Sequence, residues 1–247
     1  MKLSVVIPAY NEEAILPKAI TTLTEALEAL CADAKSPISE YALLIVSDGS
    51  TDKTPIILQD AAKRERNLVP IVYTPNRGKG CAIRHGICAS TQASDGSEDY
   101  VLYTDCDLAY GTDVIGQAVT QLCETQADIL IGSRAIHPDG YAGYTPLRKF
   151  ASILYLRFLS VAAGFPHSDS QAGFKAMRGA VGREIFAQCT TDGFAFDFEM
   201  LMRAQKAGCT FTEMPIKIVN HRQSSIHLIK DSLHMLRDIA KIKKDIK

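Results

Sequence analysis

The sequence lacks any run of about 18 apolar residues, the length that a membrane-spanning helix needs. We expect no amino-terminal signal peptide, because residues with strand character begin at Leu3. An excess of one charge is missing too, since 27 Lys and Arg against 28 Asp and Glu give a formal net charge of −1. We therefore expect no membrane-spanning segment and no nucleic-acid partner.

The cysteines also exclude two classes of protein. There are seven of them, an odd number, and no two form a Cys-X-X-Cys pair. This scatter argues against a disulfide framework and against a structural zinc site, and it fits a reducing cytoplasm. A chain of 247 residues with 47% hydrophobic and 22% charged residues suits one large α/β domain or two small ones. Since no linker or internal repeat divides the chain, we predict a single domain over residues 1–247.

Short β-branched runs alternate with helical patterns along the first half of the chain. We predict strands at 3–7, 42–46, 69–73 and 100–103, and helices at 11–30, 53–66 and 80–89. The second half is mixed, with helices at 112–126 and 196–207, strands at 128–132 and 173–177, and an edge strand at 211–219 that contains Pro215. This alternation predicts an α/β fold with a largely parallel sheet flanked by helices.

Two carboxylates, Asp105 and Asp107, directly follow the strand predicted at 100–103. Because alternate side chains of a strand share a face, both can reach one point at the frayed end of the strand. Hard oxygen ligands of this kind suit Mg²⁺ or Mn²⁺, especially where phosphate oxygens complete the coordination. The alternative for an isolated Asp-X-Asp sequence is a solvated acidic turn.

Polar clusters follow the first two strands as well, and right-handed crossovers place all of them on one sheet edge. Tyr10 can stack on a base, and Asp48 and Glu12 can accept hydrogen bonds from a nucleoside. Lys79, between two glycines, can approach a phosphate closely. The plainer alternatives are a helix cap at Asn11, a turn at Asp48 and a surface basic turn at Lys79.

Taken together, these motifs resemble the family 2 inverting glycosyltransferases of the GT-A fold. The resemblance lies in Val5–Glu12 (VVIPAYNE), Ser47–Asp52 (SDGSTD) and Asp105–Asp107 (DCD). Further segments are similar to the dolichyl-phosphate β-glucosyltransferase and polyprenyl-phosphate glycosyltransferase branch: 76–80 (NRGKG), 132–134 (GSR), 169–175 (DSQAGFK) and 194–199 (FAFDFE). The chain departs from this pattern at Ser47, where an Asp is usual, and at 224–226, where the branch tends to have Gly-Ser-Lys.

The resemblance implies a role for each matching residue. Nucleotide-sugar binding falls to Pro8, Ala9, Tyr10, Glu12, Asp48, Lys79, Asp105, Cys106 and Asp107. Asp105 and Asp107 also become the ligands of Mg²⁺ or Mn²⁺. Apart from the resemblance, the cations that can hold an acceptor phosphate in line are Arg134, Arg148, Lys175 and Arg222, and the candidate catalytic residues are Asp169, Asp197 and Arg134. Residues 1–132 become the nucleotide-sugar half of the domain, and residues 133–224 become the acceptor half.

The expected reaction is transfer of a hexose, glucose by the resemblance, from a UDP-sugar to a polyprenyl phosphate. A phosphate monoester has its second pKa near ~6, so at pH 7 it is mostly dianionic and hardly needs a general base. A soluble hydroxyl acceptor is the alternative, and it would need a base, for which Asp169 or Asp197 is the candidate. A nucleotidyltransferase usually has a Gly-rich loop where this chain has Pro8-Ala9-Tyr10. A non-catalytic nucleotide-binding protein would not need both Asp105 and Asp107.

The end of the chain, residues 225–247, has the pattern of a basic amphipathic helix. An apolar stretch at 147–163 also carries basic residues. A helix of this kind can lie on an anionic membrane or pack on the sheet and leave a solvated basic face. We expect a cytoplasmic protein with peripheral contact to the cytoplasmic face of a membrane, because a polyprenyl phosphate presents its head group there.

Overall fold

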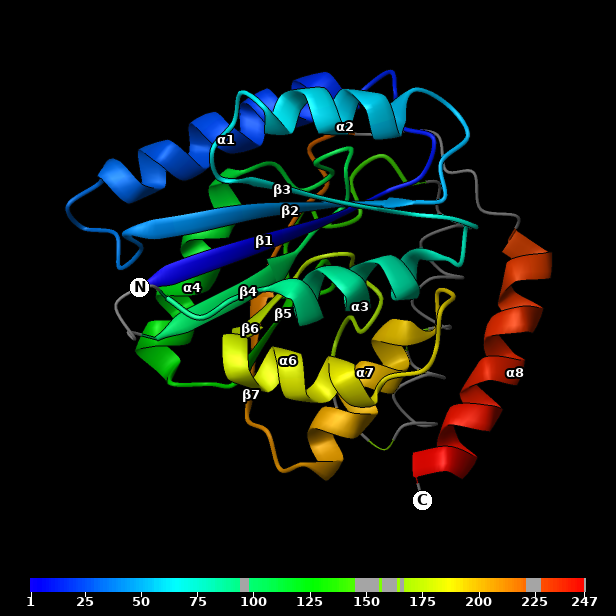
Figure 1. Cartoon of the computed structure of the whole chain (residues 1–247). Coiled ribbons are helices and arrows are strands. Elements are labelled where there is room, and N and C mark those ends of the chain that lie inside the picture. Colours follow the sequence, from blue (N-terminus) through cyan, green and yellow to red (C-terminus); the bar gives the residue numbers. More distant parts are fainter. Residues whose placement is uncertain (94–97, 145–155, 157–163, 165–166, 221–227, 247) are drawn as a thin grey trace.

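The structure is a computed structural model that describes residues 1–93, 98–144, 156, 164, 167–220 and 228–246. One seven-stranded sheet runs through it in the order β3-β2-β1-β4-β6-β5-β7 (Figure 1). The strands are β1 (Lys2–Ala9), β2 (Glu40–Asp48), β3 (Leu68–Tyr73), β4 (Asp99–Tyr103), β5 (Ile129–Ser133), β6 (Lys175–Arg178) and β7 (Phe211–Pro215). The helices are α1 (Leu16–Ala32), α2 (Thr54–Ala62), α3 (Lys79–Ala89), α4 (Asp113–Thr125), α6 (Gly179–Gln188), α7 (Phe196–Lys206) and α8 (Leu228–Ile246).

The sheet is mostly parallel, as the alternation of strands and helices predicted. β1 pairs in parallel with β2 and β4, β2 with β3, and β5 with β7. Among the described strands only β6 runs against its neighbours, between β4 and β5. β7 ends the sheet, which is the edge position expected of a strand that contains a proline.

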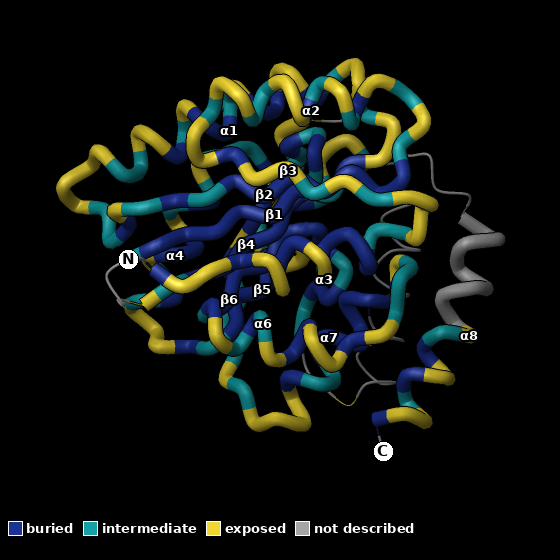
Figure 2. Tube along the Cα trace, viewed as in Figure 1, coloured by how far each residue is buried: buried dark blue, intermediate teal, exposed yellow. Residues whose placement is uncertain are grey.

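Two apolar clusters cover the two faces of the sheet. One contains residues of α1, α2 and α4, and the other contains residues of α3, α6, α7 and α8. The central strands are buried on both sides, which Figure 2 shows as a continuous dark band through the middle of the molecule. This explains why β1 and β2 read as nearly unbroken apolar runs rather than as alternating ones.

The parallel register brings the predicted polar clusters to one edge of the sheet. Ala9, at the end of β1, is opposite Ser47, and Asp48, at the end of β2, is opposite Tyr73. The amide of Thr104, just after β4, donates to the carbonyl of Val6 at 3.2 Å. The turns that follow β1, β2, β3 and β4 therefore lie side by side, as ligand-binding turns do in open α/β sheets.

Three helices differ from the sequence-based prediction. α1 begins at Leu16 rather than at Asn11, because Asn11 has a left-handed backbone (φ 55°) and Pro17 starts the first helical turn. α2 ends at Ala62, four residues earlier than expected. α6 was not predicted, since Gly179 and Gly182 weaken its helical pattern.

The last turns of α8 pack on the protein. Ile239, Ile242 and Ile246 are buried in the same cluster as α7, and the Lys206 ammonium donates to the carbonyl of Ile246. Arg237, Lys241 and Lys244 are exposed. No helix within the described residues is both long enough and apolar enough to cross a membrane.

Candidate active site

The turns after β1 and β2 are tied to each other by hydrogen bonds. The Asn11 side chain accepts from the amide of Thr51 at 2.8 Å, and the amide of Glu12 donates to Thr54 Oγ1 at 2.8 Å. Glu13 Oε2 accepts from the amide of Lys53 at 2.9 Å, next to the start of α2. Asn11 therefore does not cap α1, the alternative that the sequence offered, and Asn11 and Glu13 join the two turns. Tyr10 projects from this junction with 49% of its surface exposed.

Asp48 organises the turn that follows β3. Its Oδ1 accepts from the amide of Arg77 at 2.8 Å, and its Oδ2 accepts from the amide of Gly78 at 2.8 Å and from Asn76 Nδ2 at 2.9 Å. The carboxylate is 3% exposed. A carboxylate can accept about four hydrogen bonds, so the chain itself fills most of this capacity. The nucleoside contact expected of Asp48 thus stays a prediction, whereas its role in shaping the 76–78 turn is visible.

Lys79 is the first residue of α3, and its ammonium forms an ion pair with Asp105 Oδ1. Burial lowers the pKa of Lys79, but the attraction of Asp105, Asp197 and Asp107 outweighs it and leaves this pKa raised. The pair lies against Gly173, where a Cβ would come within 2.4 Å of Asp105 Oδ2 and 3.1 Å of Lys79 Nζ. The lysine and the first aspartate of the Asp-X-Asp sequence are thus in contact.

Asp107 lies in the next turn, where its Oδ1 accepts from the amide of Ala109 at 3.1 Å. Asn220 Nδ2 donates to the carbonyl of Leu108 at 2.9 Å and so fastens this turn to the segment after β7. Among the described residues, no three His, Cys, Asp or Glu side chains are grouped to hold a metal by themselves. Mg²⁺ is commonly held by one or two carboxylates together with substrate phosphates. Asp105 and Asp107 fit that chemistry.

Arg134 and Asp169 form a second ion pair. Arg134 Nε and Nη2 donate to the two carboxylate oxygens at 2.6 and 2.9 Å, and the amide of Arg134 donates to Oδ2 at 3.1 Å. Asp169 is fully buried, and its presence raises the pKa of the Arg134 guanidinium even though burial opposes this. Arg134 Nη1 also donates to the Tyr144 hydroxyl at 3.3 Å.

Lys175 and Asp197 form a third ion pair, and both of its side chains are buried. Lys175 Nζ lies 2.7 Å from Asp197 Oδ1 and donates to the carbonyl of Ala172 at 2.8 Å. The Tyr103 hydroxyl donates to the same carboxylate. Lys175 is completely buried. The direct contact with an acceptor phosphate expected of Lys175 stays a prediction, whereas its pairing with Asp197 is visible.

The predicted site residues therefore fall into four groups, one of which is the buried Lys175–Asp197 pair. Lys79, Asp105 and Asp107 come together at the carboxyl edge of the sheet, with Arg134 and Asp169 near them, since the Tyr110 side chain is within electrostatic range of Arg134, Asp105 and Asp169. Pro8, Ala9, Tyr10, Glu12 and Asp48 lie at the ends of β1 and β2, and Cys106 is buried between the two aspartates. Arg148, Arg222 and most of the 147–163 stretch lie outside the described residues.

Sequence reasoning missed several residues that shape this site. Gly173 gives room to the Lys79–Asp105 pair, and the Tyr110 hydroxyl accepts from the amide of Gly173 at 3.2 Å. Asp192 contacts two arginines near Lys79. Glu199, which belongs to one of the quoted motifs, received no role, although it is 1% exposed and ion-paired with Arg203. The sequence alone does not show that Glu199 is buried, so it gave no reason to assign this residue a role.

Comparison with known proteins adds an independent observation. The family described as "Glycosyl transferase family 2" matches residues 4–199. A dolichyl-phosphate beta-glucosyltransferase of Trichomonas vaginalis is 32% identical over 244 residues, which cover 97% of this chain and 72% of that protein. One of Dictyostelium discoideum is 27% identical over 249 residues, covering 98% and 73%.

Solved structures share the fold. Glucosyl-3-phosphoglycerate synthase of Mycobacterium tuberculosis, crystallised with Mn²⁺, UDP and phosphoglyceric acid, superposes with a TM-score of 0.68 at 17% identity, over 99% of this chain and 78% of that one. A complex of the same enzyme with UDP-glucose gives 0.67 at 18% identity, over 98% and 79%. The predicted GT-A fold is thus confirmed.

Proposed function

Because this chain belongs to glycosyl transferase family 2 and is a glycosyltransferase, we propose that it transfers glucose from UDP-glucose to a polyprenyl phosphate with inversion. The two relatives described above, both dolichyl-phosphate beta-glucosyltransferases, support the sugar and the acceptor. The finding of UDP and Mn²⁺ in a protein of the same fold supports the nucleotide and a divalent cation.

The observation that carries the acceptor is the state of the two candidate bases. Asp169 is held by Arg134, and Asp197 is held by Lys175 and by the Tyr103 hydroxyl. Neither carboxylate is placed to remove a proton from an alcohol without first losing a buried partner. An acceptor that is already dianionic at pH 7 needs no such base. The arrangement thus favours a phosphate acceptor over a hydroxyl.

The residues of this chain would act mainly by positioning charge. Asp48 and Tyr10 shape and face the nucleoside side, and Asp105 and Asp107 would hold Mg²⁺ or Mn²⁺, which neutralises the leaving diphosphate when bound. Lys79 adds a cation at the same place. Arg134 presents a planar guanidinium, oriented by Asp169, to either the acceptor phosphate or the donor diphosphate. Inversion then requires the acceptor oxygen to attack from the face opposite the diphosphate.

A labelled-donor experiment tests the proposal. Purified protein is given UDP-glucose labelled in the sugar, polyprenyl-phosphate vesicles and Mg²⁺ or Mn²⁺, and the products are extracted with chloroform. We expect label in the organic phase, and we expect EDTA or Asp107→Ala to abolish it. A new labelled product in the aqueous phase, distinct from UDP-glucose and free glucose and formed when soluble acceptors are supplied instead, would support the hydroxyl alternative. Undiminished transfer by Asp107→Ala in EDTA would contradict the metal site.

A further inference from the structure

The segment between α6 and α7, residues 190–193, packs against the turn that carries Lys79. A Cβ on Gly78 would lie 2.6 Å from the Asp192 carbonyl oxygen, and a Cβ on Gly80 would lie 2.6 Å from the Thr191 carbonyl oxygen. The amide of Cys81, in the first turn of α3, donates to the Asp192 carbonyl at 3.2 Å. The glycines on both sides of Lys79 are therefore needed for this close backbone approach, apart from any approach to a phosphate.

The Asp192 side chain grips the same turn through two arginines. Its Oδ2 accepts from Arg77 Nε and Nη2 at 3.1 and 2.9 Å, and its Oδ1 accepts from Arg84 Nη2. Burial raises the pKa of the Asp192 carboxyl, but the bonds from Arg84 and Arg77 outweigh it and leave this pKa lowered. Arg77 precedes Lys79 by two residues, and Arg84 lies one helical turn and a half after it. We call Asp192, Arg77 and Arg84 the clamp. Its two arginines lie on either side of Lys79 in the sequence.

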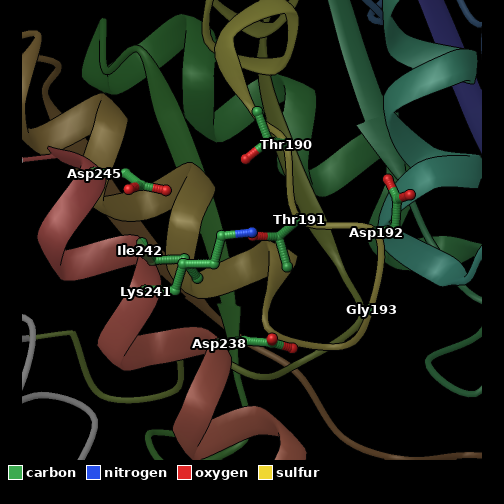
Figure 3. A pocket seen from close by; sticks show the side chains of 8 residues that line it. All are labelled: Thr190, Thr191, Asp192, Gly193, Asp238, Lys241, Ile242 and Asp245. Carbon is green, nitrogen blue, oxygen red and sulfur yellow. The ribbon is translucent and has the colours of Figure 1, made fainter.

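Hydrogen bonds to α7 hold the segment that carries Asp192. Glu199, in the first turn of α7, accepts from the amide of Thr191 at 2.7 Å and from the amide of Thr190 at 3.0 and 3.1 Å. Arg203 Nε donates to the same carboxylate at 2.8 Å. On the opposite side of segment 190–193, a cavity of about 250 Å³ separates it from α8. Figure 3 shows the Asp192 side chain turned away from α8 and toward α3.

We propose that Asp192 is a positioning residue for donor binding, which acts by fixing the 77–81 turn so that the Lys79 ammonium stays beside Asp105. The proposal rests on the donor site of the proposed function. Asp48 fastens the same turn through the amides of Arg77 and Gly78, upstream of the lysine. Without the Asp192 carboxylate the turn would keep Asp48 and the backbone hydrogen bond from Cys81 to the Asp192 carbonyl, but Arg77 and Arg84 would lose their shared counter-charge.

The chain offers a matched control for this clamp. Asp99 and Arg183 form a similar bidentate pair, at 2.6 and 3.1 Å, at the opposite edge of the sheet where β4 begins. Asp192→Asn and Asp99→Asn each remove one carboxylate charge from an Arg–Asp contact. Asp99 contributes nothing to the site, so its variant reports the general cost of such a loss.

The test measures donor affinity and local dynamics in the full chain. We expect Asp192→Asn to weaken the binding of UDP in Mn²⁺ by about tenfold and to raise the KM for UDP-glucose more than it lowers kcat, the scale seen when a residue that orients a ligand is lost. Arg77→Gln is expected to act in the same direction by a smaller factor, because Arg84 remains. Asp99→Asn is expected to leave UDP affinity and KM unchanged. UDP affinity of Asp192→Asn equal to that of Asp99→Asn overturns the proposal.

Hydrogen exchange separates this inference from the proposed function. We expect faster exchange of the amides of residues 77–82 in Asp192→Asn and unchanged exchange there in Asp99→Asn. This comparison needs no nucleotide. If the wild-type protein binds no UDP, the proposed donor is wrong, and the exchange data still decide whether Asp192 holds the turn. Equal protection of residues 77–82 in wild type and Asp192→Asn overturns the positioning role.

Discussion

At the scale of single residues, the short segment 169–175 connects the three ion pairs of the site. Asp169 orients Arg134, Gly173 lies under the Lys79–Asp105 pair, and Lys175 neutralises Asp197. Lone charges at these depths would be costly, whereas paired and hydrogen-bonded ones persist. The segment therefore sets the distances among the charged groups. At Gly173 there is no room for a side chain, because Asp105 and Lys79 lie against its Cα.

A methyl group at position 173 tests the hypothesis that this segment sets the distances among the charged groups. Gly173→Ala would place a Cβ 2.4 Å from Asp105 Oδ2 and 3.1 Å from Lys79 Nζ, so one of the two side chains must move. We expect transfer activity to fall by about two orders of magnitude, in line with the cost of displacing reacting groups by about 1 Å. The change in the free energy of unfolding should be small, about 1 kcal/mol, since the Asp105 side chain is 31% exposed and can shift toward solvent. Activity assays and urea unfolding measure both quantities.

Gly193→Ala is the matched control for that variant. There a Cβ meets only Asp238 Oδ2 at 3.8 Å, an ordinary contact, and the residue has no left-handed backbone. We expect near wild-type activity. Equal loss of activity in the two alanine variants would show that added bulk anywhere near α7 disturbs the enzyme, and that Gly173 has no special place.

The clustering of these side chains could be predicted because Asp105 and Asp107 follow one strand-like run closely and Lys79 lies in the turn after another. Lys79, Asp105 and Asp107 were predicted together and lie together. The burial of Lys175 was not predicted. Lys175 is a basic residue inside a predicted strand, which suits a phosphate site, and its complete burial against Asp197 and Tyr103 is visible only in the folded structure. Burial depends on contacts far away in the sequence, so local patterns do not reveal it.

At the scale of elements, the connections between strands and helices differ most from expectation. A good cap residue at Asn11 suggested an early start for α1, but the Asn11 side chain bonds to Thr51 instead. That bond depends on β1 and β2 being neighbours, which propensity does not report. In the same way, the 190–193 connection looks like an ordinary loop in sequence, yet it is held by the buried Glu199 of α7.

The pH dependence of stability tests the role of Glu199. Burial raises its pKa, but hydrogen bonds from Thr191 and Arg203 outweigh this and leave the pKa below its ordinary value of 4.5. A depressed folded-state pKa means that the unfolded chain binds a proton first. The stabilisation is therefore present above pH 4.5 and is lost as the pH falls through the folded-state pKa, at most about 1.4 kcal/mol per pH unit for one proton.

We expect Glu199→Gln to lower the free energy of unfolding at pH 7 by about 2 kcal/mol, the scale of a hydrogen bond to a charged group. The difference from wild type should shrink as the pH is lowered below 4.5. Urea unfolding at a series of pH values gives this curve. A difference that stays constant down to acid pH would mean that the charge of Glu199 does not hold the 190–193 connection.

At the scale of the whole molecule, the alternation of strands and helices was enough to predict the class of fold. It was not enough to predict the order of the strands in the sheet. The antiparallel β6 lies between β4 and β5, so residues from both halves of the chain form the centre of one sheet. Periodicity gives each strand but carries no information on its neighbour. The prediction that all the polar turns share one edge held because the first four strands are parallel, and handedness then fixes their direction.

The packing of α8 on the protein limits the ways in which this helix can bind a membrane. In its last three turns the isoleucines at 239, 242 and 246 are buried against the protein, and the exposed Arg237, Lys241 and Lys244 share the other face. This part of the helix can therefore offer charge to a lipid surface but no apolar face. Removing it would expose part of the core, as three buried isoleucines would be lost, so truncation cannot test its membrane role cleanly.

Charge substitutions test it instead. An enzyme that uses a polyprenyl phosphate must visit the membrane surface, and each basic residue near an anionic leaflet is worth on the order of 1 kcal/mol. We expect replacement of Arg237, Lys241 and Lys244 by Gln to weaken co-sedimentation with vesicles of phosphatidylserine and phosphatidylcholine on the order of a hundredfold at low salt. The matched control replaces Lys18, Lys35 and Lys63, which are also exposed but lie on the side of α1 and α2. At high salt the difference between the two triple variants should vanish, because the attraction is screened within a few ångströms. Equal binding of both variants at low salt would show that the basic face of α8 is only a solvated surface.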